Sequence, residues 1–199
     1  MITLETPAGV YRDVPVTLRG PQHAENMSLA LMVAECAARP VADPLVRQAL
    51  SALRSPGRAE LVCSKPAVLL DGAHNPAGAR ALAVTLGESF PVDRRAFVVG
   101  ISVDKPAAEI VTALEVRPHD VVVCCAADSS RAMAAADLAA IVRAVVPSAV
   151  VEVARSVRDG VCRAIAARHR PELVVVTGSL YVVGQARDLF RGLLDPGLW

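Results

Sequence analysis

Short apolar runs recur along the chain from about residue 59 onward and alternate with stretches whose apolar positions have helical spacing. Each run is short enough for a buried parallel strand. The runs cover 67–70, 96–100, 121–125, 150–153 and 173–177, and helical spacing covers 76–87, 105–115, 134–146, 156–168 and 180–193. This alternation predicts an α/β fold: a mostly parallel sheet with helices on both faces and right-handed crossovers.

The first 54 residues have a different pattern. Residues 2–5 and 10–18 predict two strands around a turn, and helices are predicted over 24–38 and 43–53. The first of these helices has so many apolar positions that we expect it to be buried on more than one face. Two strands and two helices cannot easily enclose a core alone, so these residues are expected to end a larger domain. Ser55-Pro56-Gly57-Arg58 predicts a linker.

Composition and cysteine usage narrow the class of protein. The chain has 199 residues, 53% of them hydrophobic but only 3% aromatic, and a net charge of +1. Without a basic or acidic stripe, nucleic acid and membranes are not expected as partners. The five cysteines form no C-x-x-C pair, which disfavours a disulfide framework or a zinc site and favours a reducing, cytoplasmic location. No signal peptide or membrane-length apolar run is visible.

Several familiar catalytic motifs are missing from this sequence. It contains no G-x-x-x-x-G-K-[ST], no G-x-G-x-x-G, no H-E-x-x-H and no G-x-S-x-G. The histidines and cysteines also lack metal-ligand spacing. A self-sufficient nucleotidase, dehydrogenase or hydrolase of the usual kinds is therefore disfavoured.

The most informative stretch follows the first apolar run. Asp71 and His74 lie on a short predicted loop, and Asn75-Pro76 then begins a helix as an N-cap residue and a first-turn proline. Ligands of open α/β sheets bind outside the carboxyl ends of the strands. The start of a helix also offers free N–H groups to an anion.

Polar side chains follow three other predicted strands at the same relative place, so one edge of the sheet should collect them. An Asp there could bind a ribose, and a Ser at a helix start could hold a carboxylate or a phosphate. Lys105 adds charge, and Arg58 could bind a phosphate with two hydrogen bonds. The residues are Gly100, Asp104 and Lys105; Asp128, Ser129 and Ser130; and Thr177, Gly178 and Ser179.

Each of these residues also has a plainer interpretation. Asp71 could only cap the following helix, and His74 could be an ordinary hydrogen-bonded loop residue. The segment Thr177–Ser179 could be a turn with an N-cap, and Arg58 could be a solvated linker residue. Only their convergence on one edge of the sheet favours a functional site.

Five segments together resemble the folylpolyglutamate synthase / dihydrofolate synthase family of ATP-dependent ligases, which are related to the Mur ligases. Leu-Asp-Gly-Ala-His-Asn-Pro resembles a signature of that family, and the resemblance covers essentially the whole chain. The other segments resemble the family's G-x-H-Q-x-x-N, P-G-R, D-K-D and T-G-S motifs. In order, they are Gly20–Asn26, Ser55–Arg58, Asp104-Lys105 and Val176–Gly184.

The resemblance implies a domain organisation and a set of site residues. Residues 59–199 would form a Rossmann-like domain of the Mur ligase C-terminal type, 55–58 the linker, and 1–54 a small α+β remnant of the ATP-binding domain, without its P-loop part. By resemblance, Asn26, Arg58 and Asp71 contact ATP. His74 and Ser179 are candidates for binding glutamate. The Mg²⁺ ligands would lie on the missing N-terminal half, and no metal ligand is expected in this chain.

The implied reaction is ligation through an acyl phosphate. ATP would phosphorylate a carboxylate of dihydropteroate or (tetrahydro)folate, and the amine of L-glutamate would attack it to form an amide. This chemistry needs charge neutralisation and alignment. The chain alone is expected to be inactive without the P-loop half, and its helix over 27–37 should expose an apolar face that this half would cover.

The sequence departs from the family at two places, and other functions stay open. Gln22-His23 reverses the usual order of these residues, and Pro106 replaces the second Asp of D-K-D. One alternative is a fragment of a Mur-type or other amino-acid ligase, which Gly72 disfavours. Another is a non-catalytic module that binds a nucleotide or a partner.

Overall fold

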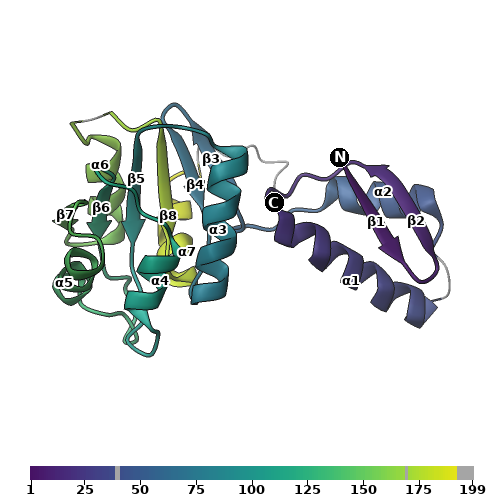
Figure 1. Cartoon of the computed structure of the whole chain (residues 1–199), viewed down its shortest axis with the longest axis horizontal. Helices are drawn as coiled ribbons and strands as arrows, with labels where there is room; N and C mark the ends of the chain where they lie inside the picture. The colour runs from purple at the N-terminus through teal and green to yellow at the C-terminus, as the bar shows by residue number, and fades with distance from the viewer. Residues whose placement is uncertain (39–40, 169, 192–199) are drawn as a thin grey trace. The chain divides into compact units, whose positions relative to one another are not determined.

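The computed structural model describes residues 1–38, 41–168 and 170–191. The chain forms two compact units, Met1–Pro56 and a larger one that begins at Gly57 (Figure 1). None of the described helices is both long enough and apolar enough to cross a bilayer.

The second unit is built on a six-stranded sheet with the order β3-β4-β8-β5-β6-β7. β3 pairs antiparallel with β4, and the other neighbouring strands pair in parallel. The sheet is therefore mostly parallel, as predicted. Its strands are β3 (Glu60–Ser64), β4 (Ala67–Leu70), β5 (Arg95–Val99), β6 (Val121–Cys124), β7 (Val150–Val153) and β8 (Leu173–Thr177).

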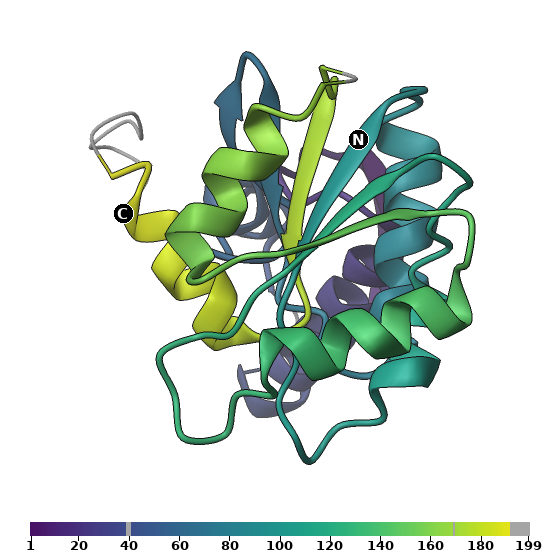
Figure 2. The same cartoon turned by 90° about the vertical axis from the view of Figure 1, so that its left-hand side faces the viewer.

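Helices cover both faces of this sheet, which confirms the predicted layers. From β4 through β5 and β6 to β7 the chain moves in one direction across the sheet, and from β7 to β8 it returns. Crossovers of one hand then place α3, α4 and α5 on one face and α6 on the other, where α7 joins it (Figure 2). The helices are α3 (Pro76–Ser89), α4 (Ala107–Ala113), α5 (Ala135–Val145), α6 (Val157–Ile165) and α7 (Leu180–Asp188).

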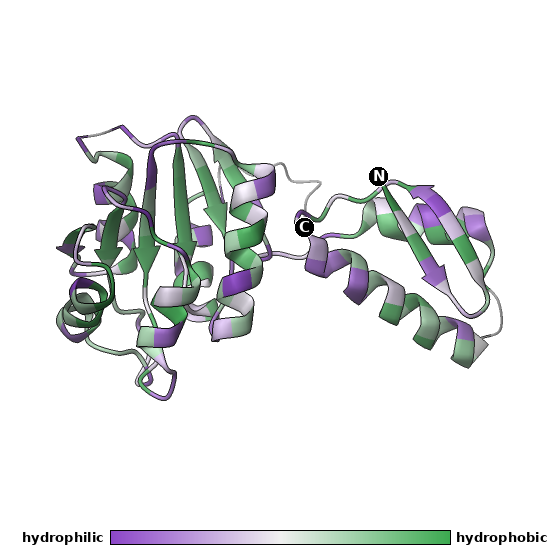
Figure 3. Ribbon diagram, in the orientation of Figure 1, coloured by the Kyte–Doolittle hydropathy of each residue, from purple (hydrophilic) through white to green (hydrophobic). Residues whose placement is uncertain are grey.

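Alternate residues of the central strands fill two separate cores. Phe97 and Val99 of β5 face α3, α4 and α5, whereas Ala96 and Val98 face α6 and α7. Because both faces are buried, these strands are nearly continuous apolar runs, as Figure 3 shows. Val, Leu, Ile and Ala supply most of the buried side chains, which accounts for a full core in a chain with few aromatic residues.

The structure corrects several predicted boundaries of the second unit. β3 was not predicted, because the strand has only five residues, which are mixed in polarity and mostly only partly buried. The predicted helices over 105–115 and 156–168 are shorter at both ends, as α4 and α6. Positions 192–193 of the predicted helix 180–193 lie outside the described residues.

The predicted linker is divided between the two units. Its last two residues, Gly57 and Arg58, belong to the second unit. Hydrogen bonds hold Gly57 there: its carbonyl accepts from Gly72 N at 2.8 Å, and its N–H donates to Glu60 Oε2 at 2.8 Å. The backbone at Arg58 is therefore fixed against the sheet.

The first unit encloses a small core of its own, contrary to our expectation. β1 (Ile2–Thr6) and β2 (Gly9–Val14) form an antiparallel pair, which packs with α1 (Pro21–Ala38) and α2 (Asp43–Ala52). β2 ends before the predicted position 18, because Pro15 has no N–H to donate to a partner strand. The buried apolar residues are Leu4, Tyr11, Val14, Met27, Leu31 and Val46.

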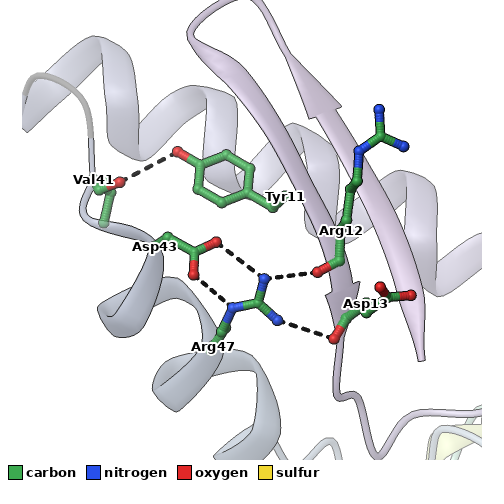
Figure 4. Close-up of polar contacts among 6 residues, drawn as sticks. All are labelled: Tyr11, Arg12, Asp13, Val41, Asp43 and Arg47. Atoms are coloured by element: carbon green, nitrogen blue, oxygen red, sulfur yellow. Dashed lines mark hydrogen bonds and ion pairs between the residues drawn. The ribbon is translucent and has the colours of Figure 1, made fainter.

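Polar contacts fix the two helices to this hairpin, and Figure 4 shows those made by Arg47 of α2. The Arg47 side chain on α2 is paired with Asp43 at 2.6 Å and donates to the backbone carbonyls of Arg12 and Asp13 at 2.7 and 3.0 Å. The buried Tyr11 hydroxyl donates to Glu35 Oε1 on α1 at 2.7 Å, and this hydrogen bond raises the pKa of Tyr11.

One face of α1 is apolar and exposed, as predicted for the helix over 27–37. Leu29 is 61% exposed and Val33 is 62% exposed. The expectation that the helix is buried on more than one face is therefore wrong for this chain. Only the face that carries Met27, Leu31 and Glu35 is buried.

Candidate functional site

Asp71 directly follows β4 and is buried, with 6% of its surface exposed. Its carboxylate accepts two backbone hydrogen bonds, Oδ2 from Ala59 N at 2.8 Å and Oδ1 from Ala73 N at 2.9 Å. It does not cap the following helix, because Asn75 does so through a 2.7 Å hydrogen bond from Gly78 N. The capping interpretation of Asp71 is therefore wrong. Its carboxylate instead joins the segment beside Arg58 to the end of β4.

His74 lies half-buried on the same loop, as predicted. Its Nδ1 lies 2.9 Å from the carbonyl oxygen of Gly72. Because a carbonyl can only accept, Nδ1 carries the hydrogen, and in the neutral ring Nε2 is an acceptor. The plain interpretation of His74 as a hydrogen-bonded loop residue is correct for Nδ1, and Nε2 has no hydrogen-bond partner among the described residues.

Arg58 is connected to Asp71 through the backbone. The residue after it, Ala59, donates its N–H to the Asp71 carboxylate. The Arg58 guanidinium makes no hydrogen bond or ion pair with any other described residue, so its five donors stay available to a ligand. The structure thus brings Arg58 and Asp71, which are 13 positions apart in the sequence, to one place.

The segment after β8 lies against this loop. Gly178 N donates to the Ala73 carbonyl at 3.0 Å, and Asp71 N donates to Val176 O at 3.0 Å. Ser179 is buried and caps α7, where its Oγ accepts from Tyr181 N at 3.2 Å. The N-cap interpretation of Ser179 is correct, and its hydroxyl hydrogen can still be donated to a ligand.

A small pocket opens at the carboxyl edge of the sheet, between the segments that follow β5, β6 and β8. Its cavity volume is only about 10 Å³, roughly that of one water molecule, and three serines and one tyrosine are among its lining residues. Sequence reasoning anticipated Gly100, Ser129 and Ser179 there but missed Ser102, Ala132 and Tyr181 as lining residues. Tyr181 is 53% exposed. The full lining is Gly100, Ile101, Ser102, Ala127, Ser129, Ala132, Ser179, Tyr181 and Val182.

Asp104 and Lys105 lie on the loop after β5, and an ion pair holds this loop to the one after β6. Asp104 Oδ2 is 2.8 Å from Arg131 Nη2 and 3.4 Å from Lys105 Nζ. The hydrogen bond from Arg131 lowers the pKa of Asp104. Backbone hydrogen bonds Val103 N to Arg131 O and Met133 N to Ile101 O, each 2.9 Å long, join the same two loops. Arg131 was not singled out from the sequence, because nothing there pairs it with Asp104.

The predicted convergence is thus correct for the second unit and untested for Asn26. Parallel strands β4, β5, β6 and β8 end at one edge, so the polar segments that follow them gather there. Asn26 is exposed on α1 of the first unit.

The carboxyl edge of the sheet offers both hydrogen-bond acceptors and hydrogen-bond donors. Asp71 offers carboxylate oxygens that accept one hydrogen bond each from the backbone in the contacts above, and Arg58 offers unpaired donors. Across residues 1–38, 41–168 and 170–191, no three His, Cys, Asp or Glu side chains group so as to hold a metal ion.

Comparison with known proteins identifies the second unit. Residues 57–180 match the family model described as Mur ligase, glutamate ligase domain. The chain belongs to the Mur ligase family. The match begins at Gly57, so it includes Arg58, Asp71, His74 and Ser179 of the Mur ligase domain.

Particular relatives and solved structures extend the comparison to the first unit. The chain is 34% identical to the dihydrofolate synthase/folylpolyglutamate synthase of Mycobacterium tuberculosis, over 96% of this chain and 42% of the relative. A probable bifunctional folylpolyglutamate synthase/dihydropteroate synthase of Halobacterium salinarum is 37% identical over 86% of the chain and 20% of the relative. The structure of Mycobacterium tuberculosis folylpolyglutamate synthase complexed with ADP aligns with a TM-score of 0.83 and 32% identity, covering 98% of this chain and 48% of that one. The chain therefore spans less than half the length of these relatives.

Proposed function

We propose that this chain is the C-terminal part of an ATP-dependent ligase that adds L-glutamate to dihydropteroate or (tetrahydro)folate. The observation that carries the proposal is the arrangement of Arg58 and Asp71. The Ala59 N–H connects them at the carboxyl edge of a Mur ligase domain, and 98% of the chain aligns with an ADP-bound synthase. In the proposal, the chain works together with a P-loop half and is inactive without it.

The nucleotide is assigned to Arg58, Asp71 and Asn26. Arg58 would neutralise phosphate charge with its unpaired guanidinium, and the Asp71 carboxylate would accept a hydrogen bond from a ribose hydroxyl. Asn26 would contact the nucleotide from the first unit. The two backbone hydrogen bonds to Asp71 support this assignment because they hold the carboxylate in one orientation before any ligand arrives.

The incoming glutamate is assigned to the pocket beside α7. Ser179 would donate its hydroxyl hydrogen to a carboxylate of glutamate, and Lys105 would add positive charge at the pocket edge. His74 Nε2 would accept a hydrogen bond from the glutamate amine and hold its lone pair toward the acyl carbon. The serine-rich lining of this pocket supports a small polar group such as a carboxylate at this place.

The chemistry needs alignment more than covalent help from the protein. The carboxylate of the pteroate or folate takes the γ-phosphoryl group of ATP, and ADP leaves. The neutral amine of glutamate then attacks the acyl carbon, and phosphate departs with the electrons of the broken C–O bond. The attacking nitrogen loses one proton to the departing phosphate, which leaves the amide. Magnesium, whose ligands are expected on the other half, would supply additional charge neutralisation when bound. The residues of this chain hold the two substrates in register. A reducing, cytoplasmic location fits the unpaired thiols.

The test is release of ADP from ATP and magnesium. The 199-residue chain would be assayed alone and with the P-loop half of a folylpolyglutamate synthase added in trans, with glutamate and either dihydropteroate or tetrahydrofolate. We expect ADP only when both halves and both substrates are present. Asp71→Ala should abolish ADP binding and turnover together, whereas Asp188→Ala, at the far end of α7, should leave both unchanged.

Three results would contradict the proposal. ADP release by the chain alone would show that it is complete. Equal ADP binding by the wild type and Asp71→Ala would remove Asp71 from the site. A preference for alanine or diaminopimelate over glutamate would replace the folate reaction with that of another amino-acid ligase.

A further inference from the structure

One face of α7 packs directly under the two glycines that flank the nucleotide residues. Leu180, Val183 and Arg187 lie three and four positions apart, so they form a single stripe along the helix. A Cβ on Gly72 would collide with Leu180, and a Cβ on Gly57 would lie 2.8 Å from Val183 Cγ1. Both glycines therefore let the backbone approach α7 more closely than any other residue would.

The third member of the stripe, Arg187, continues this contact with an ion pair. Arg187 Nε donates to both carboxylate oxygens of Glu60, at 2.9 and 3.0 Å. The side chains are only 14% and 19% exposed, and 127 positions separate them in the sequence. Glu60 Oε2 in turn accepts from Gly57 N at 2.8 Å. The Arg187 side chain of α7 and the Gly57 N–H thus share one carboxylate.

Arg58 is therefore held on both sides by groups that do not contact its own side chain. Gly57 before it is bound to Glu60 through its N–H and to Gly72 through its carbonyl. Ala59 after it is bound to Asp71. Gly57 has a φ of 71° and Ala59 a φ of 44°, so this segment follows a backbone path that it would rarely adopt without these bonds.

We propose that Glu60 and Arg187 are positioning residues, which fix the backbone beside Arg58 and thereby direct its guanidinium toward the phosphates of a nucleoside diphosphate. The inference rests on the proposed nucleotide role of Arg58. It extends the site from the carboxyl edge of the sheet to the far end of α7.

The test separates positioning from simple stabilisation. In Arg187→Gln, we expect the Gly57 amide hydrogen to exchange with solvent roughly ten-fold faster or more. The reason is that Glu60, which accepts this hydrogen bond, loses its ion pair with Arg187. The affinity for magnesium-ADP should fall in the same variant. Arg163→Gln on α6 is the matched control, since it removes an arginine paired with Asp159 and Glu152 but remote from Gly57, and it should change neither quantity.

Two further variants determine whether Arg187 acts through Arg58. In an Arg58→Gln background, Arg187→Gln should have no additional effect on ADP affinity. The double variant Glu60→Arg, Arg187→Glu can remake the ion pair but leaves Gly57 N without an acceptor, because a guanidinium only donates. We expect it to recover thermal stability while the fast exchange at Gly57 persists.

Each result decides between the alternatives. Unchanged Gly57 exchange in Arg187→Gln overturns the inference, and so does full recovery of Gly57 protection in the charge-swapped variant. If Arg187→Gln lowers the affinity for ADP as much in the Arg58→Gln background as in the wild type, the inference is also overturned. If the wild type fails to bind ADP while Gly57 exchange responds as expected, the nucleotide role of Arg58 is refuted, and the hydrogen-bonded support of Gly57 is established separately.

Discussion

Two neighbouring arginines at the start of β5 form ion pairs of very different burial, and we predict very different effects of breaking them. Arg95 and Asp120 are each 3% exposed and lie 2.6 Å apart. Arg95 also donates to Glu115 O at 3.1 Å, and Asp120 also accepts from Arg117 N at 2.8 Å. Arg94 and Glu172 are 3.5 Å apart and 53% and 44% exposed.

The expected cost follows from what each variant leaves behind. Arg95→Met leaves the Asp120 carboxylate buried without its cation, which typically destabilises by about 3–5 kcal/mol. Glu172→Ala removes a solvent-screened pair and should cost no more than about 1 kcal/mol. A domain is usually stable by only about 5–15 kcal/mol, so the first change removes a large share of the total. Adding Asp120→Asn to Arg95→Met should recover about half of the loss, since the buried charge is gone and the Arg117 N–H keeps an acceptor.

Amide hydrogen exchange of β5 and β6 in increasing urea measures the stability of the second unit by itself. Because this pair lies at the opposite edge of the sheet from Asp71, ADP affinity should be unchanged in every variant that folds. If Arg95→Met costs no more than Glu172→Ala, the argument from burial is wrong. If adding Asp120→Asn to Arg95→Met lowers the stability of the second unit further, the loss of stability in Arg95→Met does not come from an uncompensated charge.

Three smaller predictions test local features of the site and its surroundings. Asn75→Ala should destabilise the second unit by about 1 kcal/mol in urea denaturation, and Asn75→Gly by only a few tenths, because Asn75 is the N-cap of α3; equal losses would contradict the capping role. Arg131 lowers the pKa of Asp104 below its ordinary 3.8, so this pair stabilises the folded state above about pH 4 and is lost as the pH falls through the lowered pKa. An NMR titration of Asp104 should show its pKa rise in Arg131→Gln, and no rise would refute the pairing in solution. Burial raises the pKa of Cys124 and Cys125 to about 12, so neither thiol is reactive at pH 8. Iodoacetamide at pH 8 should label the exposed Cys36 and Cys162 within minutes, as mass spectrometry would show. Cys124 and Cys125 should stay unlabelled until the protein unfolds.

Much of the fold was predictable because the parallel strands are buried on both faces. Such strands are continuous apolar runs, and the runs at 121–124 and 173–177 could be recognised without any other information. β3 was missed because an edge strand with one exposed side does not form a continuous apolar run. The order of the strands was not predictable either, since nothing in Leu173–Thr177 specifies that it lies between β4 and β5.

The candidate site was predictable only as far as local sequence determines it. Asn75 and Ser179 are N-caps because of their neighbours in the sequence, and both were anticipated. The contact of Asp71 with Ala59, and that of Glu60 with Arg187, join residues that are distant in the sequence. Hydrophobic periodicity carries no information about such pairs, so only the folded chain could supply them.

The strand order has a consequence for how this chain is synthesised and folded. β8 follows the other five strands of this sheet in the sequence, yet it lies between β4 and β5, which have no ladder of hydrogen bonds to each other. While the ribosome has delivered only the residues before 173, β4 has just its antiparallel partner β3, and both central strands have an unpaired edge. Insertion of Leu173–Thr177 closes the sheet and, through Asp71 N to Val176 O and Gly178 N to Ala73 O, completes the site in the same event. A nascent chain that stops short of this strand would expose two apolar edges suited to aggregation, so completion of this sheet and formation of the site depend on residues 173–178, which are translated after the other five strands.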